Sequence, residues 1–337
     1  MSIPHNEDSR VKIPALLHFL RLGYIYQTKK GTNIDSRNNI FVDIFKRSIS
    51  SINNKDYDNK FIDNLLKEIS DITDNDKDKG ENFFNRLIGY HKVKLIDLEE
   101  PYRNDFRVVT ELKFKVENVE FRPDVTILVN GIPIAFVEVK KPNNHNGIRA
   151  EFDRMRDRFK IKEFTKFFNQ FQVLGFTNNM PYDDNARIKL QGSFYTTPNF
   201  ENTTYNNFRE EKEIAVNEYI NSGVEGLGDQ NSIIDYILSD NNIMSIKTTS
   251  EFETNLKPDT YANRFITSLF SIERLIFFIR YGIVYVNSSR DGLNKHIIRY
   301  PQFFAIQKLI PMMSDRVLKK VFIGTHKVAV KRLWHIS

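Results

Sequence analysis

RPDVTILVNGIPIAFVEVKK, residues 122–141, is the most informative stretch of this sequence. It contains two runs of apolar and β-branched residues on either side of Asn130 and Gly131, and an Asn-Gly pair in that position predicts a tight β-hairpin. The runs ILV and IAFV leave no polar face for water. We therefore expect both strands to lie inside a sheet that is covered on both faces.

Three ionisable residues lie near the open end of this hairpin. Glu138 and Lys140 are two residues apart in the second strand, so their side chains leave the same face of the sheet, together with Ile134. Regular pairing outward from the turn sets Asp124, at the start of the first strand, near Val137. The pattern therefore places Asp124 beside Glu138, within reach of one shared ion.

Such a cluster is suited to the hydrolysis of a phosphodiester. Two carboxylates that converge in a low dielectric repel each other unless a cation or a proton compensates. Mg²⁺ meets this demand, because Asp124, Glu138 and the Val139 carbonyl offer the hard oxygen ligands that it prefers. Lys140 is then placed to orient or deprotonate a water and to neutralise the phosphate. A cross-strand salt bridge at the end of a sheet produces the same residues, so a purely structural interpretation stays open at this point.

The composition sets outer limits on the function. The chain has 337 residues, enough for about two domains, and its net charge of +6 permits a nucleic-acid partner without demanding one. The absence of cysteine excludes disulfides, cysteine-bound zinc, iron–sulfur clusters and thiol nucleophiles. The seven histidines include no pair at metal-ligand spacing. No apolar run is long enough to span a membrane, and the first residues lack the core of a signal peptide, so we expect a cytoplasmic protein.

Hydrophobic periodicity predicts an α/β fold, in which a mixed sheet is flanked by helices and followed by a mainly helical segment. The last long apolar helix could be mistaken for a membrane span, but Glu273 and Arg274 in its middle predict a buried packing helix. Helices are expected at 13–20, 38–53, 59–72, 83–87, 147–162, 209–240 and 265–279, and strands at 92–98, 106–116, 122–129, 133–141 and 172–178.

Pro123-Asp124 followed by Glu138-Val139-Lys140 resembles the PD-(D/E)XK nuclease motif. The wider segment resembles the amino-terminal nuclease domain of the restriction (R) subunit of type I restriction–modification enzymes. The resemblance implies a restriction-endonuclease-like core over residues 1–210, with Asp124 and Glu138 as metal-binding and catalytic residues and Lys140 as a catalytic residue. It covers most of residues 10–180, because further short matches occur in the family order: Leu22-Gly23-Tyr24, Gly89-Tyr90, Ile96-Asp97, Pro101, Asn104-Asp105-Phe106 and Val129-Asn130-Gly131-Ile132-Pro133.

A second resemblance lies near the end of the chain. The segment RYPQFFA, residues 299–305, is similar to the Q-motif that opens the first motor domain of these subunits, in which a glutamine reads the adenine of ATP; Gln302 is the matching residue. Taken alone, the segment is an ordinary amphipathic helix. The resemblance implies a helical linker and the beginning of a helicase-like motor in residues 211–337. The Gly-rich phosphate-binding loop that follows in the family does not occur in this sequence, so we expect a truncated motor, with ATP hydrolysis confined to a full-length subunit.

The helix after the second strand of the hairpin departs from the family pattern. Its sequence AEFDRMRDRF, residues 150–159, lacks the Gln-x-x-x-Tyr element that the family often carries, and Arg154 and Arg158 or Phe159 occupy that space. An upstream helical acid sometimes completes such sites, and Glu7 is the candidate here. Basic residues are frequent in this region, and they predict either a phosphate-binding face or an exposed face of intrahelical ion pairs: Lys140, Lys141, Arg149, Arg154, Arg156, Arg158, Lys160 and Lys162.

The leading hypothesis is an Mg²⁺-dependent endonuclease domain of a type I restriction subunit, which acts on double-stranded DNA together with separate modification and specificity subunits. Two alternatives stay open. One is an inactive truncated module that docks on those subunits without cutting. The other is a stand-alone PD-(D/E)XK nuclease with its own recognition domain in residues 210–337. Binding of a divalent ion separates the first alternative from the leading hypothesis, and cleavage without partners or ATP would favour the second.

Overall fold

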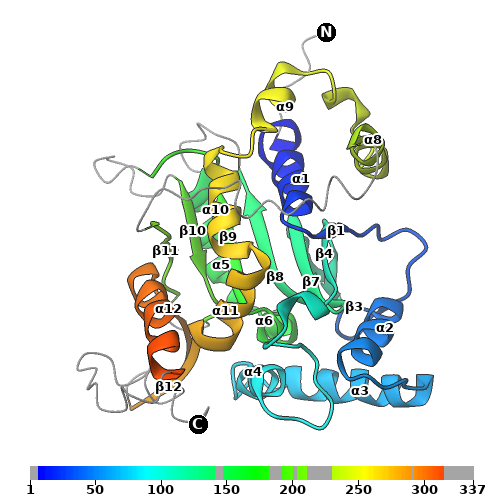
Figure 1. Cartoon of the computed structure of the whole chain (residues 1–337), viewed down its shortest axis with the longest axis vertical. Helices are drawn as coiled ribbons and strands as arrows, with labels where there is room; N and C mark the ends of the chain where they lie inside the picture. The colour runs from blue at the N-terminus through cyan, green and yellow to red at the C-terminus, as the bar shows by residue number, and fades with distance from the viewer. Residues whose placement is uncertain are drawn as a thin grey trace.

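The computed structural model describes residues 7–140, 147–182, 192–199, 203–210, 230–289 and 292–314. Its central sheet consists of β1 (Ile25–Tyr26), β4 (Phe106–Thr110), β7 (Val125–Val129), β8 (Ile132–Val139), β9 (Val173–Thr177), β10 (Ser193–Thr196) and β11 (Asn206–Asn207). The seven strands lie in the order β1-β4-β7-β8-β9-β10-β11 (Figure 1). β1 is parallel to β4 and β8 is parallel to β9, while the other neighbours are antiparallel. The predicted α/β class with a mixed sheet is confirmed.

The central strands β7 and β8 form the hairpin that the Asn-Gly pair predicts. Asn130 and Gly131 have φ angles of 54° and 79°, the left-handed values that a two-residue type I′ turn requires. Val129 pairs with Ile132 across the turn, and every residue of both strands is buried. A Cβ atom on Gly131 would lie 2.7 Å from the carbonyl oxygen of Phe41. Glycine is therefore required here both for its backbone conformation and for its small size.

One irregularity in this hairpin changes the expected register. Ile134 has no pairing partner in β7, and such a β-bulge moves the register beyond it by one residue. Asp124 therefore lies opposite Glu138, and the pairing with Val137 that a regular hairpin predicts is wrong. The expected side of Ile134 is wrong for the same reason. Ile134 packs in one hydrophobic cluster with Ala135 and Val137, on the face opposite to Glu138.

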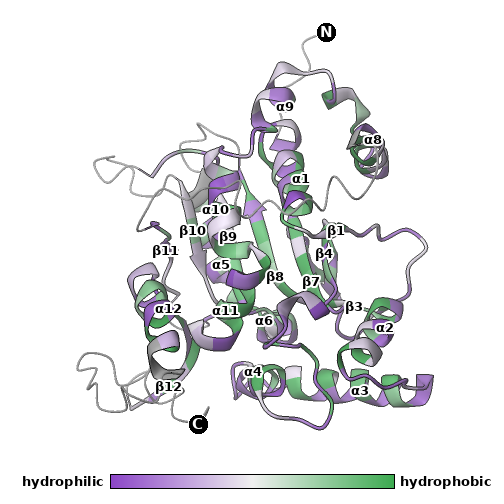
Figure 2. Cartoon of the chain, in the orientation of Figure 1, coloured by the Kyte–Doolittle hydropathy of each residue, from purple (hydrophilic) through white to green (hydrophobic). Residues whose placement is uncertain are grey.

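Helices cover both faces of the sheet (Figure 1). One face carries α1 (Ile13–Arg21), which continues the short π-helix Asp8–Lys12, together with α10 (Tyr261–Phe270) and α11 (Ile272–Phe277). The other face carries α5 (Gly147–Phe159) and α6 (Thr165–Gln170). A Cβ atom on Gly175 of β9 would lie 2.9 Å from the Phe270 ring, so glycine lets α10 approach the sheet closely. The buried strands β7 and β8 are hydrophobic along most of their length (Figure 2).

A group of helices and two-residue strands packs at one end of the sheet. It contains β2 (Ile34–Asp35), β3 (Ile40–Phe41), α2 (Val42–Ile52), α3 (Asn59–Thr73) and α4 (Glu81–Ile88) (Figure 1). The hairpin of β5 (Phe114–Val116) and β6 (Val119–Phe121) follows β4 in the chain. The helix expected at 38–53 begins only at Val42, because Asn39 has a left-handed φ of 53° and the next two residues pair as a strand.

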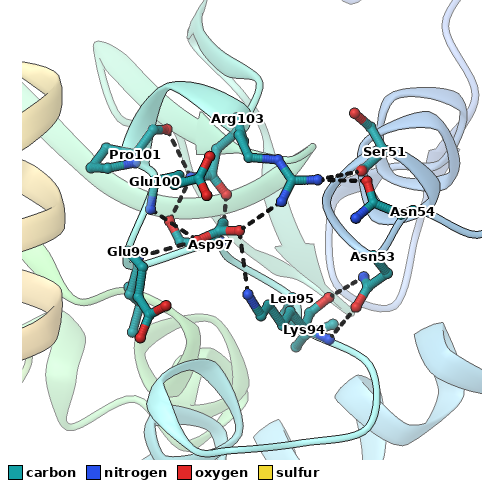
Figure 3. Close-up of polar contacts among 12 residues, drawn as sticks. Ser51, Asn53, Asn54, Lys94, Leu95, Asp97, Glu99, Glu100, Pro101 and Arg103 are labelled. Carbon is teal, nitrogen blue, oxygen red and sulfur yellow. Dashed lines mark hydrogen bonds and ion pairs between the residues drawn. The ribbon is translucent and has the colours of Figure 1, made fainter.

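The strand expected at 92–98 is wrong, because the backbone of this segment bonds to side chains instead of to a neighbouring strand (Figure 3). Asn53, at the end of α2, accepts from Lys94 N at 2.8 Å and donates to Lys94 O at 3.0 Å. The Asp97 carboxylate accepts the N–H groups of Glu99 and Glu100 at 3.1 and 3.0 Å. The segment leads into a short 3₁₀ helix, Pro101–Arg103.

The C-terminal part is mainly helical, with one hairpin that was not predicted. Its elements are α8 (Gln230–Asp240), a 3₁₀ turn (Met244–Ile246), α9 (Ser250–Asn255), α10, α11, a π-helix (Phe278–Gly282), β12 (Ile283–Ser288), β13 (Gly292–Ile297) and α12 (Tyr300–Ser314). The single helix expected at 265–279 is interrupted at Ser271, whose ψ of 146° is extended. Most of the segment 209–240 lies outside the described residues, and α8 is its described end.

The C-terminal helices share one hydrophobic cluster with the sheet and α1. A division into domains at residues 210 and 211 therefore stays a prediction from the sequence. Among the described residues, no helix combines the length and the apolar character needed to cross a lipid bilayer.

Candidate active site

The hairpin brings the three predicted site residues together. Asp124 comes directly before β7, Glu138 is near the end of β8, and Lys140 follows that strand. The backbone N–H of Val139 donates to Oδ2 of Asp124 at 2.8 Å, and Nζ of Lys140 lies 3.8 Å from the same oxygen. The cluster thus rests on the pairing of two buried strands, which fixes its backbone.

Burial and the neighbouring charges shift the pKa values of two residues in this cluster, Glu138 and Lys140. Glu138 is only 5% exposed, and burial, followed by the charge of Asp124 and a hydrogen bond with it, raises the pKa of Glu138 well above its ordinary value. Burial alone would lower the pKa of Lys140, but the carboxylates of Asp124, Glu138, Glu7 and Glu151 outweigh it and raise that pKa. Lys140 is therefore held as a charged ammonium.

Glu7, the upstream acid suggested by the family resemblance, lies at this cluster. Its Oε1 is 3.6 Å from Nζ of Lys140. Burial raises the pKa of Glu7, against the opposing charge of Lys140. Glu7 directly precedes the π-helix Asp8–Lys12, which packs against α1 and α9.

Glu151 is a site residue that the sequence analysis missed. Its Oε2 lies 3.8 Å from Nζ of Lys140, and the residue is 1% exposed. The sequence predicts for the basic helix either a phosphate-binding face or an exposed face of ion pairs, yet Glu151 lies four residues before Met155 and eight before Phe159. These residues form one helical stripe, and both apolar members are buried. An acid on an apolar stripe was the signal that could have identified Glu151.

Two arginines of α5 neutralise Glu151. Arg158 Nη1 lies 3.5 Å from Glu138 Oε1 and 3.5 Å from Glu151 Oε1. Arg154 Nη1 lies 3.0 Å from Glu151 Oε2, but this contact lacks hydrogen-bond geometry, and no other described residue donates a hydrogen bond to this buried oxygen. Arg156 pairs with Asp153 at 3.0 Å on the exposed side of the helix.

The predicted basic residues therefore lie in two different environments. Arg154 and Arg158 bind acids of the site, whereas Lys160 and Lys162 are exposed. The side chains of Lys141 and Arg149 lie outside the described residues. The segment is thus neither a uniform phosphate-binding face nor simply a face of intrahelical ion pairs.

The donor set at the hairpin fits a hard divalent ion such as Mg²⁺. Asp124 and Glu138 offer carboxylate oxygens in contact with each other, and the Val139 carbonyl lies beside them, where it accepts from Nζ of Lys140 at 2.7 Å. In the described part of the chain, no three histidine, aspartate or glutamate side chains are arranged to hold a metal. An ion here would therefore rest on two carboxylates, with the carbonyl and water as further ligands.

Gln302, the predicted adenine-reading residue, lies in another part of the molecule. Its Oε1 accepts from the backbone N–H of Arg299 at 2.9 Å, at the start of α12. Phe303 of α12 packs on the ring of Phe278 with the centroids 5.1 Å apart, and on the ring of Phe208, directly after β11, at 5.5 Å. The Gln302 side chain thus stabilises the beginning of its own helix, and the structure does not bring Gln302 to the acidic cluster.

Comparison with known proteins identifies relatives of one kind. A family model described as "Type I restriction enzyme R protein N terminus" matches residues 4–182. The "Putative type I restriction enzyme MjaIXP endonuclease subunit" of Methanocaldococcus jannaschii is 25% identical over 344 aligned residues, which cover 95% of this chain and 28% of that protein. From the same organism, the similarly named MjaVIIIP subunit is 37% identical over 82 residues, covering 24% of this chain and 8% of the relative.

The chain spans about 28% of the length of the relative that it matches almost throughout. The matched residues 4–182 contain Glu7, the complete hairpin and α5, and therefore every side chain of the acidic cluster. The family match extends over more than half of the sequence, and the chain belongs to the type I restriction enzyme R protein family, of which it carries the N-terminal region.

Proposed function

We propose that this chain is the nuclease region of a type I restriction R subunit and hydrolyses phosphodiester bonds of double-stranded DNA at Asp124, Glu138 and Lys140. The observation that carries the proposal is the convergence of these side chains at the end of a buried hairpin, where Nζ of Lys140 lies 3.8 Å from Asp124. Membership of the R protein family and the resemblance to the PD-(D/E)XK motif support this assignment.

Each residue has a distinct part in the proposed reaction. Asp124 is oriented by the N–H of Val139, and its carboxylate contacts Glu138, so the two acids together would bind the cation. Glu138, which burial disfavours as an anion, supplies the second carboxylate. Mg²⁺, when bound there, would polarise the scissile phosphate and lower the pKa of a bound water. Lys140 stays charged and is placed to orient that water and to neutralise the phosphate.

The wider activity belongs to a longer protein. We propose that the full-length subunit couples cleavage to ATP-driven translocation and works with modification and specificity subunits in the cytoplasm. The N-terminal region would then contribute the cleavage site, and residues 211–337 would lead into the motor. Gln302 stays the candidate adenine-reading residue of that motor, which requires its side chain to leave the N–H of Arg299.

The test is DNA cleavage by the full-length subunit, reconstituted with its modification and specificity subunits. Asp124→Ala, Glu138→Ala and Lys140→Ala should each lower cleavage by at least about 100-fold, because each removes a group that acts on the reacting phosphate. ATP hydrolysis by the same complexes should persist. Asp153→Ala is the matched control, since this acid is exposed on α5 and should leave cleavage unchanged. Undiminished cutting by the Lys140 variant would refute the assignment.

The same complexes separate the alternatives. Assembly with partner subunits, but no calorimetric binding of Mg²⁺ or Mn²⁺, would identify a docking module. Sequence-specific cleavage by the purified chain without partners or ATP would identify a stand-alone nuclease.

A further inference from the structure

We infer that Arg158 is a resident cation of this site: its guanidinium lies between Glu138 and Glu151, where a second metal ion would have to bind, so the site takes one divalent ion, on the Asp124 side of Glu138. The inference rests on the proposed function and adds to it the number of metal ions.

The first support is the position of Arg158 between two buried acids. Its Nη1 is 3.5 Å from one oxygen of each carboxylate. The side chains of Glu138 and Glu151 are 5% and 2% exposed, and they come from different elements, β8 and α5. The Arg158 guanidinium is therefore a cation shared by the two buried carboxylates. Without it, the two acids would face each other in a low dielectric.

The second support is the chemistry of the two possible cations. A guanidinium stays charged at every accessible pH and is more weakly hydrated than an ammonium, so it tolerates partial burial. The Arg158 side chain is 21% exposed. Mg²⁺ instead requires an octahedral shell of oxygens. With Arg158 in place, one oxygen each of Glu138 and Glu151 is already engaged by the guanidinium, so these two acids do not offer that shell to a second ion.

The third support is that Arg158 is held in place. Its guanidinium lies 5.7 Å from the centroid of the Phe121 ring, which adds a cation–π contact. Its helix is anchored by Met155 and Phe159, which are 0% and 1% exposed in the hydrophobic cluster beneath α5. Arg154, by contrast, is 57% exposed and reaches Glu151 from the solvent side.

The remaining position is the one beside Asp124. Within the described residues, Arg158 forms ion pairs with Glu138 and Glu151 but not with Asp124. Beside Asp124, whose carboxylate contacts Glu138, the described residues instead place Lys140, with Nζ 3.8 Å from Oδ2 of Asp124. This is the place where one divalent ion would relieve the repulsion of two carboxylates.

The test counts bound ions and does not depend on cleavage. In a calorimetric titration of the 337-residue chain with Mn²⁺, the unaltered protein should bind one equivalent, and Asp124→Ala should bind none. Arg158→Met keeps much of the side-chain volume and removes the charge, so it should bind two equivalents. Arg156→Met is the control, because Arg156 lies on the same helix and pairs only with the exposed Asp153; it should bind one.

Two equivalents in the unaltered chain would overturn the inference, whatever the variants do. A single equivalent in folded Arg158→Met, with folding checked by circular dichroism, would overturn it as well. If that variant does not fold, Arg158→Gln replaces it, with the same expected count. No binding by the unaltered chain is a different result, because it contradicts the proposed function itself.

Discussion

The backbone N–H of Val139 donates a 2.8 Å hydrogen bond to Oδ2 of Asp124, so the strand that carries Glu138 also orients the aspartate. This relationship depends on the bulge at Ile134, which moves the register by one residue. A regular hairpin would set Asp124 opposite Val137. Because Val137 and Glu138 point to opposite faces of the sheet, Asp124 would then lie on the face away from Glu138. One extra residue in β8 thus aligns the two acids.

Glu138→Gln should stabilise the ion-free protein while it abolishes cleavage. The raised pKa of Glu138 means that folding disfavours its ionised form, so this group costs stability as the pH rises through the folded-state pKa. A neutral amide of the same shape removes that cost, and the expected gain near neutral pH is about 1–2 kcal/mol. Thermal unfolding in EDTA measures it. Glu120→Gln, on the exposed β5–β6 hairpin, should change stability little, and a lower melting temperature for Glu138→Gln would contradict the prediction.

Gly131→Ala should destabilise the fold by more than a left-handed backbone alone explains. Alanine at φ 79° is strained by about 1 kcal/mol, and its Cβ would also lie 2.7 Å from the carbonyl oxygen of Phe41. A total loss of about 2–4 kcal/mol is expected. Gly31→Ala separates the two effects, because Gly31 has a φ of 67° with no atom within 4 Å of its Cβ position. Equal losses in urea unfolding would show that the contact with Phe41 does not matter.

His18 should make the protein sensitive to acid. It is buried between α1 and α10, where Nε2 lies 2.7 Å from Oγ1 of Thr267. Burial and the charge of Arg21 lower its pKa from 6.5 to about 3. The unfolded chain therefore binds the proton more readily, so the contribution of the neutral imidazole is complete above pH 6.5 and falls by about 1.4 kcal/mol per pH unit below it.

His18→Gln should remove this slope between pH 6 and pH 4, measured by urea unfolding at several pH values. His91→Gln is the control, since His91 is exposed after α4 and should leave the slope unchanged. An unaltered slope in His18→Gln would assign the acid sensitivity to other groups.

Arg274→Met should loosen α12 from the rest of the molecule. Arg274 binds Glu210 through two nitrogens, at 2.7 and 3.2 Å, and its guanidinium lies 5.3 Å from the Phe303 ring centroid. Its side chain is only 8% exposed, so its removal leaves a mostly buried carboxylate unpaired, at a cost of about 3 kcal/mol. Hydrogen exchange should quicken in α12. Arg280→Met, whose ion pair with Glu99 is 3.9 Å long, should cost less than about 1 kcal/mol, and equal effects of both changes would argue against the docking role.

The errors of the sequence-based prediction have physical causes that can be named. The segment 92–98 has strand-like periodicity, but the side chains of Asn53, Asn104 and Asn130 take up its backbone hydrogen bonds. The charged sequence around Glu151 is typical of an exposed helix face, yet its position on the stripe of Met155 and Phe159 places Glu151 in the interior. Both outcomes depend on which elements pack nearby, and local patterns carry no such information.

By itself the sequence determined the hairpin, the two-residue spacing of Glu138 and Lys140, and the family, because turn chemistry, the two-residue period of a strand and ordered motifs are all local properties of the chain. Only the tertiary structure decided that Asp124 faces Glu138, that Glu7 and Glu151 approach Lys140, and that Arg158 lies between two acids. Those relationships arise where β8, α5 and the first helical turn pack around one buried point. Burial raises the pKa of Glu138 and the neighbouring carboxylates raise the pKa of Lys140, so the packing decides the charge of both groups.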